Sequence, residues 1–287
     1  MVIKAERLPV PGETVIGHQF MMNPGGKGAN QAVAVARMGG NVSFITKTGN
    51  DLFGRQSVEL YRSENIGTDY IFSDQDHPSG VAMISVDAVG ENCILVAPGA
   101  NSTLTIADIE KARKEIERAD ILLMQLEIPM ETVEYAAEMA AAKGVKVALN
   151  PAPAQSLSDK LLKCLYLITP NKTEAEMLTG ISVKDWASAR RAADKISERG
   201  VDIVVITLGA LGALIKEGSE YHEVSSEKVK AIDTTAAGDT FCGTLSVALC
   251  EGRSVVEAVK MACKASAITV TRMGAQASIP YRREIMD

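Results

Sequence analysis

The chain has 287 residues, and its 36 acidic and 30 basic side chains give a formal net charge of −6. This length suits one large domain with a sizeable core and a small appendage. The negative charge argues against nucleic acid or an anionic membrane as the main partner. It does not exclude a small anion such as ATP, because a local site can oppose the global sign.

Cysteine and histidine usage narrows the function classes further. The 5 cysteines are scattered and form no Cys-x-x-Cys pair, and the 3 histidines lie far apart. We therefore expect reduced thiols in the cytoplasm rather than a disulfide framework, and no histidine-rich metal site. No apolar run reaches about 18 residues and no signal-peptide pattern is present, so we expect no membrane-spanning segment.

The first part of the chain predicts an extended segment over residues 1–17, with an edge strand at 15–17. Residues 23–38 then combine a glycine-rich entry with a strong helix pattern. The bare backbone lets a polar ligand approach, and a lysine and an asparagine offer hydrogen bonds to hydroxyls. These candidates are Gly25, Gly26, Lys27, Gly28 and Asn30. The spacing does not match a Walker A loop, and the alternative is a flexible loop before a core helix.

Residues 80–87 and 92–97 flank a short turn and predict a β-hairpin. Paired with the N-terminal segment, this hairpin could form a small sheet beside the glycine-rich segment. Such a sheet would act as a lid that excludes water, which competes as an acceptor in phosphoryl transfer. The alternative is an edge hairpin of the main sheet. We assign residues 1–17 and 79–98 to the lid, and residues 18–78 and 99–287 to the α/β domain.

Strands and helices alternate through most of the remaining chain. Strands are expected at 42–46, 120–126, 145–149, 166–169 and 201–207, and helices at 51–65, after Thr105, and at 130–142, 184–199, 238–251 and 254–270. This rhythm predicts a parallel sheet covered on both faces, with ligands at the carboxyl ends of its strands. Polar residues gather at those ends, although each alone could be a helix cap or turn residue. They are Glu127, Asn150, Asn171, Glu174, Thr207 and Gly209.

Residues 230–245 carry the most informative stretch. An apolar strand end enters a turn of small residues, and a helix pattern starts near Ala237. Backbone N–H groups in the first turn of a helix form a cradle for anions. Asp239 lies inside that cradle, where it could take a proton from a substrate hydroxyl while the cradle stabilises a transferring phosphoryl group. The alternative is an ordinary first-turn aspartate next to a packing glycine.

Two segments resemble the two signatures of the ribokinase-type carbohydrate kinases. They are Gly25-Gly-Lys-Gly-Ala-Asn-Gln31 and Asp233-Thr-Thr-Ala-Ala-Gly-Asp239. Shorter matches to that family occur at 9–14, 125–127, 150–153, 170–174 and 274–278, so the resemblance covers nearly the whole chain.

The resemblance implies a doubly wound, mostly parallel α/β sheet with helices on both faces, and a β-sheet lid through which two copies form a homodimer. It implies ATP-dependent phosphorylation of D-ribose at the 5-hydroxyl, with Mg²⁺ beside the nucleotide and K⁺ as an activating cation. Asp239 is then the catalytic base, and Ala236, Ala237 and Gly238 form the anion hole for the γ-phosphate. The implied sugar contacts are Gly25, Gly26, Lys27, Gly28, Asn30, Glu127 and Asp239.

Two further sets of residues are implied by the same resemblance. The ATP and Mg²⁺ side comprises Asn171, Glu174, Thr207, Leu208, Gly209, Ala210, Leu211, Gly212, Gly238 and Cys263. The K⁺ positions, several acting through backbone carbonyls, are Asp233, Thr235, Thr269, Arg272, Gly274 and Ser278. Residues 271–278 are expected to loop back toward Asp233 and Thr235.

One departure from the family pattern concerns the start of the chain. Family members open with a buried strand ending in an Asn-x-Asp segment that grips the sugar, and its Asp would fall immediately before Met1. We therefore expect the first core strand to be missing, which would expose an apolar sheet edge. A sugar hydroxyl left without its partner costs about 1–3 kcal/mol. A misassigned or truncated start and a weak or inactive form both stay open.

Two other functions also stay open. A sugar- or nucleotide-binding protein without turnover is favoured by the missing strand and disfavoured by Asp239 in its complete cradle. The same chemistry could act on another alcohol, such as deoxyribose or a nucleoside. Lys27, Asn30 and Glu127 favour a small polyol, because a base-bearing substrate needs more aromatic surface than an aromatic content of 4% suggests.

Overall fold

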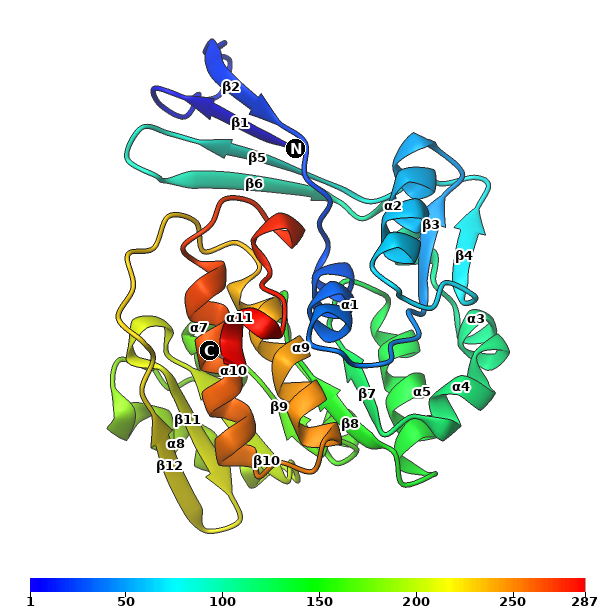
Figure 1. Ribbon diagram of the computed structural model, residues 1–287, viewed down its shortest axis with the longest axis vertical. Coiled ribbons are helices and arrows are strands. Elements are labelled where there is room, and N and C mark those ends of the chain that lie inside the picture. The colour runs from blue at the N-terminus through cyan, green and yellow to red at the C-terminus, as the bar shows by residue number, and fades with distance from the viewer. Residues whose placement is uncertain (287) are drawn as a thin grey trace.

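A small four-stranded sheet lies above a larger α/β layer in the computed structural model, which describes residues 1–286 (Figure 1). The upper sheet, called the lid sheet below, has the strand order β2-β1-β5-β6. Its strands are β1 (Val2–Ala5), β2 (Gly17–Met21), β5 (Val81–Val86) and β6 (Asn92–Ala97). Strand β1 runs antiparallel to β2 and parallel to β5. The hairpin therefore pairs with the N-terminal segment and not with the main sheet.

The main sheet has six strands in the order β12-β11-β10-β9-β8-β7. They are β7 (Ile121–Met124), β8 (Lys146–Leu149), β9 (Leu167–Ile168), β10 (Ile203–Thr207), β11 (Ala213–Glu217) and β12 (Glu220–Val224). Strands β7 to β10 are parallel, and β11 and β12 are antiparallel to their neighbours. The predicted mostly parallel sheet is confirmed, whereas the antiparallel pair at its far edge was not expected.

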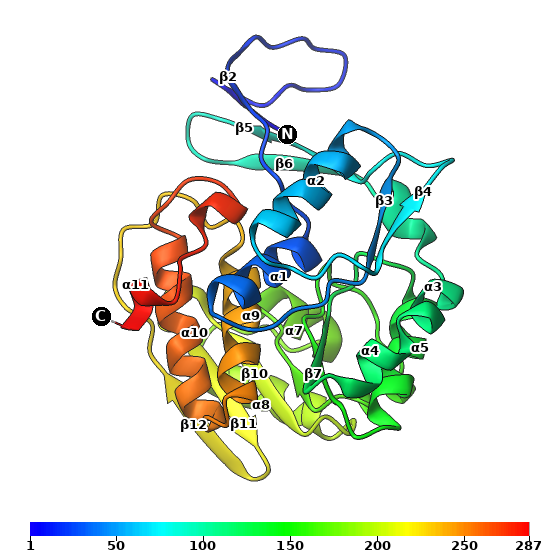
Figure 2. The same cartoon turned by 45° about the vertical axis from the view of Figure 1, so that its right-hand side comes forward.

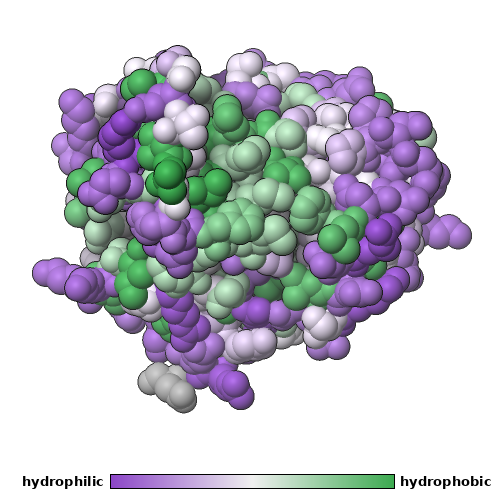
Figure 3. Space-filling model, turned by 90° about the horizontal axis from the view of Figure 1, so that it is seen from above, coloured by the Kyte–Doolittle hydropathy of each residue, from purple (hydrophilic) through white to green (hydrophobic). Residues whose placement is uncertain are grey.

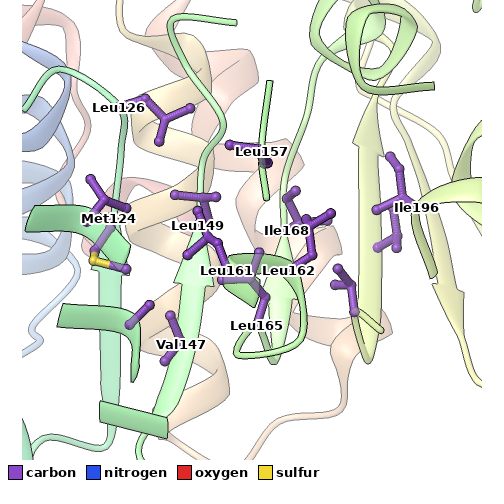
Figure 4. Close-up of a cluster of buried hydrophobic side chains, with 14 of the residues drawn as sticks. Met124, Leu126, Val147, Leu149, Leu157, Leu161, Leu162, Leu165, Ile168 and Ile196 are labelled. Carbon is purple, nitrogen blue, oxygen red and sulfur yellow. The ribbon is translucent and has the colours of Figure 1, made fainter. Parts of the chain in front are cut away.

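Helices cover both faces because the strand residues alternate in direction. Ile203 and Val205 of β10 face one apolar cluster, and Val204 and Ile206 face another. The first face carries α9 (Ala237–Cys250) and α10 (Val255–Thr269), with α1 (Lys27–Arg37) packed on α9 (Figures 1 and 2). The second face carries α3 (Ile106–Lys111), α4 (Arg113–Arg118), α5 (Met130–Ala141), α6 (Asp159–Leu162), α7 (Lys172–Thr179) and α8 (Trp186–Ser197). Figure 4 shows part of that second core, where leucines of the 157–165 segment meet β8 and β9.

A separate pair of strands, β3 (Thr46–Gly49) and β4 (Ile71–Asp74), lies beside α2 (Leu52–Ser63) (Figure 2). Asp51 caps α2 as expected, since its carboxylate accepts the N–H of Gly54. The strand expected at 42–46 was wrongly placed, because Phe44 of that run packs edge-to-face on Tyr61 while the regular pairing begins at Thr46. The edge strand expected at 15–17 likewise begins only at Gly17.

Strand β7 is bonded on one side only. It pairs with β8, and no strand within residues 1–286 pairs with its other edge. That open edge borders a cavity of about 2560 Å³, called the site cavity below. Apolar residues from β7, from the segment before β3 and from α1 and α9 line this part of it: Ile121, Leu122, Leu123, Phe44, Ile45, Val35 and Val247.

The remaining elements are one short helix and three 3-10 turns among the described residues. A short 3-10 turn (Gln276–Ser278) and α11 (Arg283–Met286) follow α10. Two further 3-10 turns span Gly99–Thr103 and Gly209–Leu211. In the part of the chain that the structure describes, no helix combines the length and apolar character needed to cross a bilayer.

Candidate active site

Asp239 lies in the first turn of α9 and is held by α1. Its Oδ2 accepts a hydrogen bond of 2.8 Å from Asn30 Nδ2, and its Oδ1 accepts one of 3.1 Å from Gln31 Nε2. The two helices approach closely at Gly243, where a Cβ would lie 2.6 Å from the Cβ of Ala34. The glycine therefore lets α1 carry its amide side chains to a carboxylate more than 200 positions away in the chain.

The pKa of Asp239 is raised above its ordinary value. The main cause is burial, since only 7% of the residue is exposed. The amide donors of Asn30 and Gln31 and the ammonium group of Lys27 oppose this effect by favouring the ionised form. A carboxylate whose pKa is raised toward neutrality is a stronger base for a hydroxyl proton than an exposed one.

The glycine-rich segment meets the loop after β7 beside this carboxylate. The backbone N–H of Lys27 donates to Glu127 Oε2 at 2.8 Å, across a backbone turn that Gly26 makes at a φ of 93°. Burial raises the pKa of Glu127, against the lowering effect of the Lys27 N–H and ammonium group. Within residues 1–286, the buried Oδ1 of Asn30 has no hydrogen-bond partner. Asn30 Oδ1 and the Glu127 carboxylate can therefore still accept hydrogen bonds from hydroxyl groups.

The start of α9 forms the expected cradle of backbone amides. Ala236, the residue before the helix, has a φ of 61°, which is strained for a residue with a Cβ. Ala237 N–H already donates to Thr234 O at 3.3 Å. The N–H groups of Gly238 and Asp239 have no acceptor among the described residues. A Cβ on Gly238 would touch nothing within 4 Å, and both Gly238 and Asp239 line the site cavity.

The loop of residues 271–278 does return to Asp233. Gly274 N–H donates to Asp233 Oδ2 at 2.9 Å, and the hydroxyl and N–H of Thr235 donate to Oδ1. Burial alone would raise the pKa of Asp233, but these donors outweigh it and hold the pKa below its usual range. The hydroxyls of Thr269 and Ser278 bond to nearby carbonyls and are fully buried.

The residues expected on the nucleotide side are only partly brought together. Asn171 and Thr207 pair through an isolated β-bridge, and Asn171 and Glu174 form the capping box of α7. All three line the site cavity with Asp239. Glu174 is buried, which raises its pKa against the lowering effect of Asn171 N–H. The turn from Leu208 to Gly212 does not line the cavity, and neither does Cys263, which lies in the apolar cluster beneath α9 and α10.

The sequence motifs singled out Asn30 but not the other amides that support Asp239. Gln31, Gln125 and Asn150 form a connected set behind the carboxylate. Gln31 follows Asn30 directly in the glycine-rich signature, and Gln125 opens the segment that ends at Glu127. Their position inside two of the matching motifs was the available signal. Asn150 ends a predicted strand and opens the matching segment 150–153.

Comparison with known proteins assigns the family. The model for "pfkB family carbohydrate kinase" matches residues 1–282. The chain belongs to this family. It is 46% identical over 286 residues to the ribokinase of Haemophilus influenzae, covering 100% of this chain and 94% of that protein. It is 36% identical to a deoxyribokinase of Salmonella typhi, covering 98% and 92%.

A solved structure agrees with that assignment. The structure of Arabidopsis thaliana ribokinase complexed with ribose and ATP matches with a TM-score of 0.92 and 29% identity. The match covers 99% of this chain and 93% of that one. This pfkB-family chain is accordingly a carbohydrate kinase, an enzyme that transfers a phosphoryl group to an alcohol, and the expected fold is confirmed.

Proposed function

We propose that this kinase phosphorylates D-ribose at its 5-hydroxyl with ATP, giving ribose 5-phosphate and ADP. The observation that carries the proposal is the Asp239 carboxylate, buried in the first turn of α9 and bonded to Asn30. Two backbone N–H groups there have no acceptor within residues 1–286. The ribokinase relatives supply the choice of sugar.

In this reaction Asp239 accepts the proton of the sugar hydroxyl. Each carboxylate oxygen accepts only one of the two amide hydrogen bonds and keeps lone-pair capacity for that proton. The hydroxyl oxygen forms a bond to the γ-phosphorus as the bond to the β-phosphate oxygen breaks, and ADP leaves. The N–H groups of Gly238 and Asp239 stabilise the charge on the transferring group. The proton passes from Asp239 to solvent when the product leaves.

The sugar is held by the glycine-rich corner. The free Oδ1 of Asn30 accepts one hydroxyl, and Glu127, already oriented by the Lys27 N–H, accepts another. The Lys27 ammonium group donates to a sugar oxygen. Gly25, Gly26 and Gly28 leave the backbone accessible. Gly28 has a further use, because a Cβ there would lie 2.9 Å from Gln125 Oε1.

The residues assigned to cations offer suitable oxygen atoms. Asn171 and Glu174 line the cavity and fit Mg²⁺, which prefers oxygen ligands and neutralises phosphate charge when it is bound with ATP. For K⁺, Asp233 links the two segments that carry the candidate positions. Thr269 and Ser278 would contribute backbone carbonyls, since their hydroxyls are already bonded. Arg272 would do the same, because its guanidinium group pairs with Glu284. K⁺ bound there would help to hold in place the loop that carries the cradle amides.

The lid sheet supports a proposal about assembly. Its outer face carries an exposed apolar set, and Figure 3, which views the molecule from above, shows apolar side chains gathered toward the middle of that face. The strand register places these residues together: Ile3, Phe20, Met83 and Leu95. We propose that two copies form a homodimer through this face, which would cover it. The cytoplasm is the proposed compartment, since none of the five cysteines forms a disulfide within the described residues 1–286.

The same reaction on 2-deoxyribose is a second candidate, favoured by the deoxyribokinase relative. Phosphate transfer from ATP to a panel of ribose, 2-deoxyribose, other small sugars and nucleosides, with and without K⁺, decides between them. We expect the highest kcat/KM for ribose and activation by K⁺. Preference for deoxyribose would move the assignment to the second candidate. ATP binding with no transfer to any acceptor would identify a binding protein without turnover.

A further inference from the structure

Gln31 is a buried residue of α1 whose side-chain amide is fully engaged. It is only 1% exposed. Its Nε2 donates to both Asn150 Oδ1 and Asp239 Oδ1, each at 3.1 Å. Its Oε1 accepts from Gln125 Nε2 at 2.6 Å. Both protons of the amide and its carbonyl oxygen therefore have partners, and one of those partners is the proposed base.

The direction of these hydrogen bonds is set by a backbone carbonyl beyond Asn150. Asn150 Nδ2 donates at 3.1 Å to the backbone carbonyl of Thr169, which can only accept. This bond turns Asn150 Oδ1 toward Gln31, so Gln31 must present its NH₂ group there. The same NH₂ group then points its second proton at Asp239. Gln125 supports this orientation by donating to the opposite side of Gln31.

We infer that Gln31, oriented by Asn150 and Gln125, is a positioning residue that presents a hydrogen-bond donor of fixed direction to Asp239 and keeps this base ionised. This inference rests on the proposed function of Asp239. A donor to a carboxylate favours its charged form, whereas Gln31 in this orientation cannot accept a proton from a carboxylic acid. The relay of amides therefore opposes burial, which raises the pKa of Asp239 by disfavouring its charged form.

The relay runs through four different parts of the fold. Gln31 lies on α1, Gln125 follows β7, Asn150 follows β8 and Thr169 follows β9. It thereby fixes the carboxylate relative to the carboxyl ends of three neighbouring strands. An oxygen of Asp239 that is free to rotate would lose the alignment needed to meet a hydroxyl proton.

The decisive experiment compares pH profiles of kcat for the wild type and Gln31→Met, a variant of similar length without hydrogen-bonding groups. We expect the acid limb to move to higher pH by about one pH unit, and kcat on the plateau to fall about tenfold. The charged or titratable groups facing Asp239 are Lys27 of α1, Glu127 after β7, Glu174 of α7 and Cys242 of α9 itself. All four are retained in the variant.

Two further variants complete the design. Asn150→Leu removes the group that orients Gln31, and we expect a smaller movement of the acid limb in the same direction. Thr244→Val is the matched control on α9, because its buried hydroxyl has no hydrogen-bond partner among residues 1–286. Its pH profile should coincide with that of the wild type. If Gln31→Met fails to fold by circular dichroism, Asn150→Leu decides.

An acid limb that is unchanged in Gln31→Met, or in Asn150→Leu when that variant decides, overturns the relay. Failure of the proposed function looks different, because the wild type would then transfer no phosphate to any sugar. In that case a ¹³C titration of the Asp239 carboxyl in the full chain still tests the relay. Its midpoint must move to higher pH in Gln31→Met, and an unchanged midpoint would overturn the inference.

Discussion

The α1–α9 wall of the site cavity and the opposite wall, formed by β7 and the segment before β3, differ in how their groups are satisfied. On the α1–α9 wall, Gly243 lets the two helices approach closely, and each carboxylate oxygen of the buried Asp239 accepts a hydrogen bond from an amide side chain. On the other wall, β7 has an unpaired edge and apolar side chains face the cavity. Preorganised polar groups and the unpaired edge of β7 thus border the same space.

This contrast assigns different roles to the two walls. The groups proposed for phosphoryl transfer lie on the α1–α9 wall, where amide hydrogen bonds hold the Asp239 carboxylate before any substrate binds. The β7 wall supplies no group proposed for the phosphoryl transfer itself, and apolar surface exposed there lowers the free energy of unfolding because it is not removed from water. Substitutions on the two walls should therefore separate activity from stability.

The largest expected effect is on turnover, from Asp239→Asn. The loss of the base should lower kcat about 10²- to 10⁴-fold, while ATP binding is retained because the cradle amides are unchanged. Steady-state kinetics and calorimetric titration with ATP measure the two quantities. A kcat near that of the wild type would exclude Asp239 as the base.

A matched pair of leucines tests the packing of the two walls. Leu245 of α9 is completely buried, so Leu245→Ala should cost about 2–5 kcal/mol of unfolding free energy. Leu123 of β7 lines the cavity and is only partly buried, so Leu123→Ala should cost clearly less. Urea unfolding measures both values. Equal losses would show that the β7 wall is packed as tightly as α9.

The open edge of β7 also predicts the effect of adding a strand. A Val- and Ile-rich extended segment fused ahead of Met1, which lines the cavity, should pair with β7 and cover its apolar residues. We expect a Tm higher by about 4 °C or more and weaker binding of an apolar dye. A fused Gly/Ser segment of equal length is the control. If both fusions give the same Tm, the edge does not accept a strand.

Lys27 tests the sugar corner between the two walls. Its ammonium group acts on the pKa of both Glu127 and Asp239, so it lies near the proposed sugar contacts. Loss of a charged hydrogen bond in Lys27→Ala should raise the KM for ribose about 10- to 100-fold and change the KM for ATP less. Equal increases in both KM values would move Lys27 out of the sugar pocket.

The strand ends around the cavity could be predicted from the sequence, and the hydrogen bonds behind Asp239 could not. The apolar runs ending in Glu127, Asn150 and Asn171 predicted strands whose ends share one edge, and the structure places those ends around the cavity. The direction of the Gln31 amide could not be predicted, because it depends on the carbonyl of Thr169, 138 positions away by residue number. The sequence pattern also could not predict that β3 lies outside the main sheet, because periodicity does not say which strands pair.

One hairpin was missed although its signal is local. Strands β11 and β12 are joined at Gly218, which has a φ of 56°. A glycine between two runs rich in β-forming residues is typical of a hairpin turn. The antiparallel edge of the main sheet was thus readable from residues 213–224, whereas the supporting amides of Asp239 required the three-dimensional arrangement.

The smallest expected effect concerns stability and uses the same carboxylate. The pKa of Asp239 is raised in the folded protein, so the native state holds this proton to higher pH than the unfolded chain does. Wild-type stability therefore falls as pH rises from about 4, the unfolded pKa of Asp, through the folded pKa. Asp239→Asn avoids this loss, and Asn30 can turn its free Oδ1 toward the new NH₂ group. The variant should have the higher Tm at pH 7 but not at pH 3.5.

Thermal unfolding from pH 3.5 to 8 measures this difference, with Asp202→Asn at an exposed position as the control. The control should follow the wild type at every pH. A Tm advantage of Asp239→Asn that is the same at pH 3.5 and pH 7 would mean that repacking, and not the buried charge, is responsible. A Tm advantage that appears only as pH rises would show that burying an ionised base lowers the stability of the α1–α9 wall.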